Sequence, residues 1–510
     1  MTKHSFLRCA PEEIGVSSRQ VMACICALEH DQTTMNGFVA ARHGKVFAEC
    51  WWSPYEQDLV HCNHSLGKSY TATAIGIAIR EGKLSLDTRL CDLFANEIAE
   101  RGIELSDKTR RITVRHALTM TNGMAHHPAM SGDWIGNYFR TPMAYEPGER
   151  FAYNSSGSCL LGAAILKATG QNMKEYLTDR LFRKIGIDPE SFVWLKFPNQ
   201  IDAQPGTFAK TEDNLRLAQL YLNGGSWNGE QILDPDFVKS ALSVQIENPY
   251  APEEKDGRCG YGYLLWACSI PGVYRFDGGQ GQFGLIWPEK DLVVAVHEGA
   301  ITPTGPQKTL DTLYETLLLQ LVDEPLPAAP EDYAALQSLQ SSVHLPPDES
   351  NRLPLNRAFA GSWRVDEGVF DPWMAVSPPG SGDLFAAFRV PERDTPISAF
   401  GLDVADNALT LSLNTGAVLR AVWDGTLTRG TVETPFPGLG AYAATARFSG
   451  EHRLDVRIHW LNGWFETELT LELLGNTLAI VTRKLRLNPA DNYMVRSEER
   501  RVGKECRSRW

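Results

Sequence analysis

Hydrophobic and polar residues follow two different patterns along the chain, and the change between them comes near residue 353. After this point, apolar residues alternate with polar ones through 454–460 and again through 469–473. A period of two is typical of strands that bury one face. Asn462-Gly463 and Gly475-Asn476 follow these runs and are hairpin-turn sequences. The pattern predicts that residues 353–490 form a separate antiparallel sandwich or barrel.

The first part of the chain mixes strand patterns with helix patterns. A hairpin is predicted within 36–51, and residues 65–240 are mostly helical. Four later strands are expected, at 261–266, 274–276, 283–287 and 292–296. A leucine-lined helix at 310–321 closes this part. Strands at both ends of a helical middle indicate an α+β fold, with one antiparallel sheet flanked by helices.

Prolines mark the boundary between the two patterns. Three of them fall between 325 and 330, and more follow up to 354, so a linker is predicted over 325–352. The expected organisation is therefore a first domain over 1–324 and a β domain over 353–490. Residues 491–510 are a tail, and from about 496 they resemble translated vector sequence. We therefore leave the tail out of the fold prediction.

Composition narrows the classes of function. The chain has 510 residues, a net charge of −13, 43% hydrophobic residues and 22% charged residues. These values describe an ordinary globular protein, and the negative charge argues against nucleic acid as a partner. No apolar run reaches membrane-spanning length, and the first residues lack the apolar core of a secretory signal. We expect a cytoplasmic protein without a membrane or nucleic-acid partner.

Cysteine and histidine residues show no metal-binding pattern. The ten cysteines are scattered and none forms a Cys-x-x-Cys pair, so buried reduced thiols are expected. The histidines that could be grouped lack zinc-protease spacing and a carboxylate companion; they are His61, His64, His126 and His127. We therefore expect no metal site.

Candidate chemistry lies at the start of the helix predicted after residue 65. Ser65-Leu66-Gly67-Lys68 is the only Ser-x-x-Lys in the chain, and positions i and i+3 share a helix face. A neutral lysine amine can take the proton of a serine hydroxyl, and burial favours that neutral form. The residues that follow are small and apolar, which predicts a buried helix. Taken alone, the tetrad also fits a capping serine beside a solvated lysine.

A second proton carrier is expected near such a nucleophile, and Tyr153 is the candidate. A tyrosine held between cations can act as a general base, because positive charge favours the phenolate. A tyrosine that only packs against its neighbours is the alternative. Tyr221 fits a Tyr-x-Asn pattern better, but it precedes Gly224-Gly225 at a helix end, so we assign it to the helix terminus.

Several blocks in consistent order resemble the serine β-lactamase-like superfamily, which includes class C β-lactamases, DD-peptidases and family VIII esterases. The likeness runs over about residues 10–325. Its main blocks are His64–Ser69, Ile112–Gly123, Phe151–Gly162, Leu220–Gly229 and Gly281–Asp291. The resemblance implies a sheet flanked by helices with an all-helical lobe.

The resemblance also implies a mechanism. Ser65 would attack an acyl carbonyl, and Lys68 and Tyr153 would carry the proton. The oxyanion would be held by the Ser65 N–H and by a second donor near Gly279-Gln280. No cofactor is implied. The chain has no Gly-x-Ser-x-Gly sequence, so an α/β-hydrolase has no nucleophile here.

Two departures from the family pattern affect the substrate. Ser155 stands where the family has the amide of Tyr-x-Asn, and Asp277-Gly278-Gly279 replaces Lys-Thr-Gly. An aspartate repels a substrate carboxylate, which favours uncharged esters or amides, or substrates with an amine. We expect Asp277 to contact Lys68 or a substrate cation. The alternative is that Asp277 is a turn residue at the end of a strand.

These patterns together predict a serine hydrolase that cleaves a small-molecule ester or amide. A β-lactamase or D-amino-acid peptidase, acting on a lactam or peptide, is the alternative among enzymes. From another class, the chain could be a ligand-binding pseudoenzyme. The β domain shows no chemical motif, and packing or shaping of the substrate entrance is its expected role.

Overall fold

The computed structural model describes residues 6–197, 199–248, 254–373, 390, 393–463, 465–485 and 501–508. The chain forms two compact units. The first comprises Met1–Cys50, Cys62–Glu298 and Thr304–Ser342, and the second comprises Trp51–His61, Gly299–Pro303 and Val343–Trp510. Two short segments of the predicted first domain therefore belong to the second unit.

The first unit is built on a sheet of seven described strands, in the order β1-β3-β2-β12-β11-β10-β9. Their bounds are Leu7–Arg8 (β1), Thr33–Arg42 (β2), Lys45–Trp51 (β3), Trp266–Ala267 (β9), Tyr274–Gly278 (β10), Gln282–Trp287 (β11) and Leu292–Ala300 (β12). Strands β9 to β12 pair antiparallel, and β1 runs parallel to β3. The predicted hairpin is confirmed as β2 and β3.

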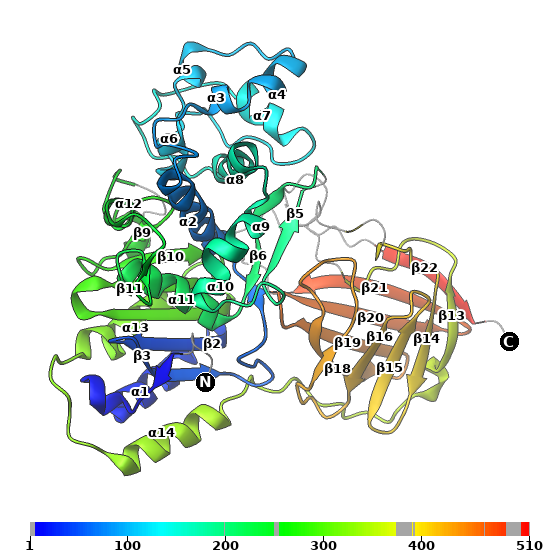
Figure 1. Cartoon of the computed structure of the whole chain (residues 1–510). Helices are drawn as coiled ribbons and strands as arrows, with labels where there is room; N and C mark the ends of the chain where they lie inside the picture. Colours follow the sequence, from blue (N-terminus) through cyan, green and yellow to red (C-terminus); the bar gives the residue numbers. More distant parts are fainter. Residues whose placement is uncertain are drawn as a thin grey trace. The chain divides into compact units, whose positions relative to one another are not determined.

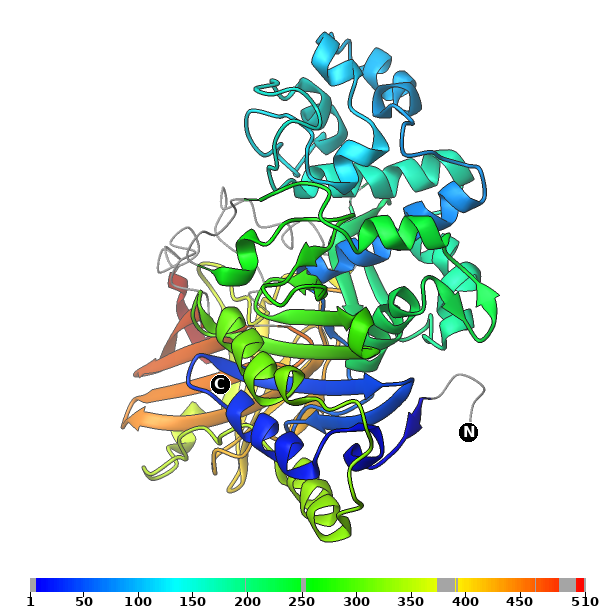
Figure 2. The same cartoon turned by 90° about the vertical axis from the view of Figure 1, so that its left-hand side faces the viewer.

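Helices cover this sheet. Helices α1 (Ser18–Leu28) and α13 (Gly305–Thr316) lie side by side on one face, as Figure 2 shows. Helix α11 (Thr211–Leu222) packs against β2 and β11. All six residues of β11 are buried, which is expected of a strand covered on both faces. None of the described helices is long and apolar enough to cross a bilayer.

A helical lobe lies above the sheet in Figure 1. Its helices are α3 (Leu90–Leu93), α4 (Ala95–Glu100), α5 (Asp107–Arg110), α6 (Val114–Leu118), α7 (Trp134–Arg140) and α8 (Ser155–Thr169). Helix α2 (Gly67–Arg80) packs against α8 and against β10, so it connects the lobe to the sheet. The predicted fold class, an antiparallel sheet flanked by helices with a helical lobe, is confirmed.

One local prediction in this unit is wrong. Of the strand expected at 261–266, only Trp266 enters a strand, because Leu264 has a φ of 58° and breaks the extended backbone. Conversely, β5 (Val193–Lys196) and β6 (Asp202–Ala209) form a strand pair inside the segment predicted as mostly helical.

The segment predicted as a linker contains a helix. Helix α14 (Pro330–Ser342) belongs to the first unit, and Arg19 of α1 ion-pairs with its Asp332 at 2.8 Å. Leu336 is its buried residue. Proline is favoured at the first position of a helix, so Pro330 marks a helix start as well as a boundary.

The second unit is a curled sheet of ten described strands, drawn in yellow to red in Figure 1. Their order is β16-β15-β14-β13-β22-β21-β20-β19-β18-β17. The bounds are Gly361–Val365 (β13), Ala399–Val404 (β14), Ala408–Leu413 (β15), Val418–Val422 (β16), Arg429–Thr431 (β17), Ala441–Gly450 (β18), Arg453–Trp460 (β19), Glu466–Leu474 (β20), Thr477–Leu485 (β21) and Arg501–Ser508 (β22). Val422 of β16 also pairs with Thr445 of β18, which curls the sheet toward a barrel.

The alternating pattern that predicted this β domain is confirmed in β19, where Leu454, Val456, Ile458 and Trp460 are buried. The tail left out of the prediction enters the sheet as β22, between β21 and β13. Sheet edges offer unpaired backbone groups to any extended segment, so this pairing does not depend on a particular side-chain pattern.

Candidate active site

Ser65 lies in a short turn of 3-10 helix, η2 (His64–Leu66), which runs directly into α2. Every residue of α2 from Gly67 to Ala78 is buried, as the small apolar residues predicted. His64 has a φ of 48°, a conformation that is uncommon outside glycine and is concentrated at functional sites. The turn places the half-buried Ser65 at the end of a fully buried helix.

Lys68 contacts Ser65 directly. Its Nζ donates a hydrogen bond to Ser65 Oγ at 2.8 Å, and the lysine is only 1% exposed. Burial lowers the pKa of Lys68 to about 7. The electrostatic effects of Cys159 and Asp277 act to raise this pKa but are smaller than the effect of burial. A substantial fraction of the lysine is therefore neutral near pH 7, and a neutral amine can accept the serine proton.

Tyr153 lies just before α8, and its hydroxyl hydrogen-bonds to Ser65. The Lys68 Nζ is 5.0 Å from the centre of the tyrosine ring, and the ring stacks on Trp266 at 5.8 Å. Burial raises the pKa of Tyr153 well above its usual value, and Asp277 adds to this rise while the bond to Ser65 opposes it. Burial therefore favours the protonated phenol, whereas the sequence suggested that neighbouring positive charge would favour the phenolate.

Asn154 and Ser155 serve the start of helix α8. Asn154 Oδ1 accepts from the Gly157 N–H at 3.0 Å, and its amide nitrogen contacts Met124 Sδ at 3.2 Å. The Ser155 N–H donates to His127 Nε2 at 3.0 Å. Within the described chain, the Ser155 hydroxyl makes no hydrogen bond. The role of Ser155 in substrate binding stays a prediction, and its backbone contact is with His127, on which the charge of Lys68 acts.

Asp277 lies on β10, and its partner is an arginine that sequence reasoning missed. Arg275 Nε donates to Asp277 Oδ2 at 2.7 Å. Asp277 is expected to contact Lys68 or a substrate cation, and its charge acts on both Lys68 and Tyr153. Burial raises the pKa of Asp277, while Arg275 opposes that rise. Residues i and i+2 share one strand face, so this spacing could have suggested the pair.

Gly279 and Gln280 form the turn between β10 and β11, beside the turn that carries Ser65. A Cβ added to Gly278 would lie 2.1 Å from the Asn63 carbonyl oxygen, so the two backbones approach as closely as glycine allows. A Cβ on Gly279 would lie 3.8 Å from the His64 ring. The structure therefore places the backbone of this turn against η2.

A buried polar network supports the turn before Ser65. Asn214 Nδ2 donates to Asn63 Oδ1 at 2.8 Å, and His297 Nε2 lies within 3.1 Å of the same oxygen. The Tyr70 hydroxyl of α2 donates to Asn214 Oδ1 at 3.0 Å. The network ties η2 to α11, β12 and α2. No short-range signal could have predicted it, because its members are far apart in the sequence.

Glu298 is buried beneath the β10–β11 turn. A Cβ added to Gly281 would lie 1.8 Å from Glu298 Oε1, and Thr309 Oγ1 donates to Oε2 at 2.6 Å. Burial raises the pKa of Glu298 to about 8, although the hydrogen bond from Thr309 acts to lower it. This carboxyl group is therefore mostly protonated in the folded protein at pH 7.

Glu298→Gln is expected to raise the free energy of unfolding at pH 7 by about 3 kcal/mol. In the unfolded chain the glutamate ionises with a pKa of 4.5, whereas in the folded protein it ionises with a pKa of about 8. The wild type therefore loses stability as the pH rises between these two values. The gain, measured by urea unfolding, should grow by about 1.4 kcal/mol per pH unit. The exposed Glu289→Gln should change little. A gain that does not vary with pH would contradict the buried-acid account.

The residues considered for a metal site lie apart. His61 belongs to the second unit, where its Nδ1 donates to the Leu461 carbonyl at 3.1 Å and burial lowers its pKa to about 4. His127 instead lies beside Ser155 in the first unit. Among the residues that the structure describes, no group of three or more His, Cys, Asp or Glu side chains could hold a metal ion. The cysteines from Cys9 to Cys268 are free thiols.

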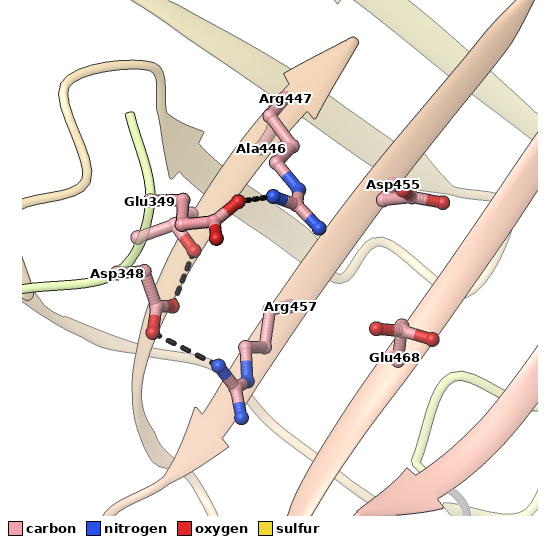
Figure 3. Close-up of a pocket in the computed structure, with 8 residues that line it drawn as sticks. Asp348, Glu349, Ala446, Arg447, Asp455, Arg457 and Glu468 are labelled. Carbon is pink, nitrogen blue, oxygen red and sulfur yellow. Dashed lines mark hydrogen bonds and ion pairs between the residues drawn. The ribbon is translucent and has the colours of Figure 1, made fainter. Parts of the chain in front are cut away.

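The second unit contains a charged cavity of about 160 Å³, shown in Figure 3. Asp348 bonds Arg457 at 3.2 Å, and Glu349 pairs with Arg447. Burial alone would raise the pKa of Asp348. Hydrogen bonds, of which the one from His459 has the largest effect, outweigh burial and lower this pKa to about 2. The other acidic groups at the cavity also pair with arginines: Asp455 with Arg453, and Glu468 with Arg483. These pairs stabilise the curled sheet, and we assign no ligand to the cavity.

Comparison with known proteins places this site in a family. The model of the Beta-lactamase family matches residues 29–302. Penicillin-binding protein 4 of Amycolatopsis lactamdurans is 26% identical over 204 residues, which cover 33% of this chain and 52% of that protein. The chain spans about half the length of the first curated relatives it matches.

Two solved structures align with this chain at low sequence identity. A putative 6-aminohexanoate-dimer hydrolase from Bacillus anthracis has a TM-score of 0.47 at 18% identity, over 58% of this chain and 81% of that one. The octameric penicillin-binding protein homologue from Pyrococcus abyssi has a TM-score of 0.44 at 17% identity, over 90% of this chain and 96% of that one.

The matched family model defines a protein with the β-lactamase fold, and the family it represents includes esterases, peptidases and β-lactamases. The chain belongs to the Beta-lactamase family. The resemblance seen in the sequence blocks is thereby confirmed.

Proposed function

We propose that this protein is a serine hydrolase that cleaves a small carboxylic ester or amide through an acyl-enzyme on Ser65. The observation that carries the proposal is the 2.8 Å hydrogen bond between Ser65 Oγ and Lys68 Nζ, with the lysine buried and its pKa lowered to about 7. Burying a lysine is costly, and its bond to a serine hydroxyl supports a catalytic use of the pair.

In the acylation step, neutral Lys68 accepts the Ser65 proton while Ser65 Oγ attacks the substrate carbonyl carbon. The carbonyl oxygen becomes an oxyanion, and the Ser65 N–H and an N–H from the Gly279-Gln280 turn would hold it. The approach of Gly278 to Asn63 supports this placement, since it brings the two backbones together.

Collapse of the tetrahedral intermediate breaks the bond to the leaving group, which must take up a proton. The protonated Tyr153 hydroxyl bonds to Ser65, so it can pass a proton to the leaving atom while it receives one from Lys68. Water then attacks the acyl-enzyme with the same groups acting in reverse. No metal or cofactor enters these steps.

The pH dependence of hydrolysis tests the proposal. With an uncharged p-nitrophenyl ester, kcat/KM should rise with pH and reach half its maximum near pH 7, because only neutral Lys68 is a base. Tyr153 should add no alkaline loss below about pH 10, because burial raises its pKa.

Ser65→Ala supplies the control, since it should remove the activity at every pH. A profile that stays flat from pH 5 to 9, or activity that survives in Ser65→Ala, would contradict the proposed roles. Parallel assays with a β-lactam decide the alternative: turnover of the lactam at least as fast as that of the ester would make the protein a β-lactamase.

A further inference from the structure

Asp277 offers an open carboxylate oxygen near the proposed nucleophile. Arg275 bonds Oδ2 at 2.7 Å, and no other described residue hydrogen-bonds the carboxylate, so Oδ1 can receive a ligand. The side chain of Asp277 is 25% exposed, whereas that of Arg275 is 5% exposed. A substrate therefore meets the carboxylate of Asp277 and not the guanidinium of Arg275.

Arg275 is held in place by contacts other than its bond to Asp277, and it leaves one oxygen of the Asp277 carboxylate open. One of its terminal nitrogens donates to the Asp256 carbonyl at 3.1 Å and to the Ala267 carbonyl at 3.2 Å. Its guanidinium lies 5.6 Å from the centre of the Trp266 ring. These contacts hold Asp277 in one position before a substrate arrives, and such preorganisation favours binding.

The exposed member of the Arg275–Asp277 ion pair is the carboxylate, because the side chain of Asp277 is 25% exposed and that of Arg275 is 5% exposed. Burial raises the pKa of Asp277, while the charges of Arg275 and Lys68 oppose this rise. The exposed carboxylate would attract a substrate cation, whereas it would repel a substrate carboxylate.

We propose that Asp277 selects substrates that carry an ammonium group close to the scissile carbonyl, so that the substrate class is amine-bearing esters or amides. This inference rests on the proposed function, because it assigns the substrate of the same site. Asp277 acts here as a specificity-determining residue. Its negative charge would attract the ammonium group, and its open Oδ1 would accept a hydrogen bond from that group.

Three fluorophosphonates that differ only in the end of the tail give the test: trimethylammonium, tert-butyl and carboxylate. The second-order rate of Ser65 labelling is measured by intact mass for the wild type and for Asp277→Asn. The wild type should react about tenfold faster with the cationic reagent than with the neutral one, and slowest with the anion. In Asp277→Asn the cation-to-neutral ratio should approach one.

Two further readouts separate charge recognition from a general loss of activity. The wild-type ratio should fall in 1 M salt, because the site is partly open to solvent. Asp291→Asn should keep the wild-type ratio, because Asp291 lies at the far end of β11 and its φ of 48° suits asparagine.

Equal wild-type rates for the cationic and neutral reagents, or an unchanged ratio in Asp277→Asn, would overturn the role of Asp277 while leaving Ser65 as the nucleophile. Absence of labelling by all three reagents would instead overturn the proposed function, and the inference with it. The two failures are therefore distinguishable.

Discussion

Replacing Lys68 with methionine is expected to lower kcat/KM by at least about a thousandfold, because the serine then has no base within hydrogen-bond distance. Methionine matches the length of the lysine stem and suits the buried site, so folding should be kept. Loss of activity with an unchanged or higher melting temperature would assign the effect to chemistry. The measurements are ester hydrolysis and thermal unfolding of the same preparation.

Lys83→Met is the matched control, since Lys83 follows α2 in an exposed position. It should keep both activity and stability. Retention of activity within tenfold in Lys68→Met would contradict the assignment of Lys68 as the base, whatever the outcome at Lys83.

Tyr153→Phe is expected to lower kcat/KM by about a hundredfold for substrates whose leaving group needs a proton. The ring contact with Trp266 at 5.8 Å does not involve the hydroxyl, so the variant should fold. The loss should be much smaller for a p-nitrophenyl ester, because p-nitrophenolate leaves without protonation. Rates for matched alkyl and p-nitrophenyl esters of one acid measure the difference.

Tyr145→Phe, in the helical lobe, removes a hydroxyl that accepts a bond from Arg150, and it should affect neither ester. Equal losses for both esters in Tyr153→Phe would contradict a role in leaving-group protonation. Such a result would assign Tyr153 to positioning Ser65 instead.

The Ser65–Lys68 contact could be predicted because it depends only on local spacing in a helix. The same is true of strands β19 and β20, where Leu454, Val456 and Ile458 and then Leu469, Leu471 and Leu473 are buried at every second position. The pairing of Arg275 with Asp277 also has a local basis, since both lie on one face of β10.

Other features of the site depend on burial by distant segments and could not be predicted. Burial favours the protonated form of Tyr153, whose ring stacks on Trp266, although the local sequence suggested a phenolate. Asn63 is held by Asn214 and His297, which only the folded chain brings together. The break at Leu264 likewise arises from a backbone conformation that its sequence pattern does not indicate.

Intact-mass analysis after incubation with a fluorophosphonate shows whether Ser65 is an activated nucleophile. We expect one phosphonyl adduct on the wild type and none on Ser65→Ala. No adduct on the wild type, or equal modification of both proteins, would contradict the assignment of Ser65 as the nucleophile. The first of these results would favour a ligand-binding protein without catalytic activity.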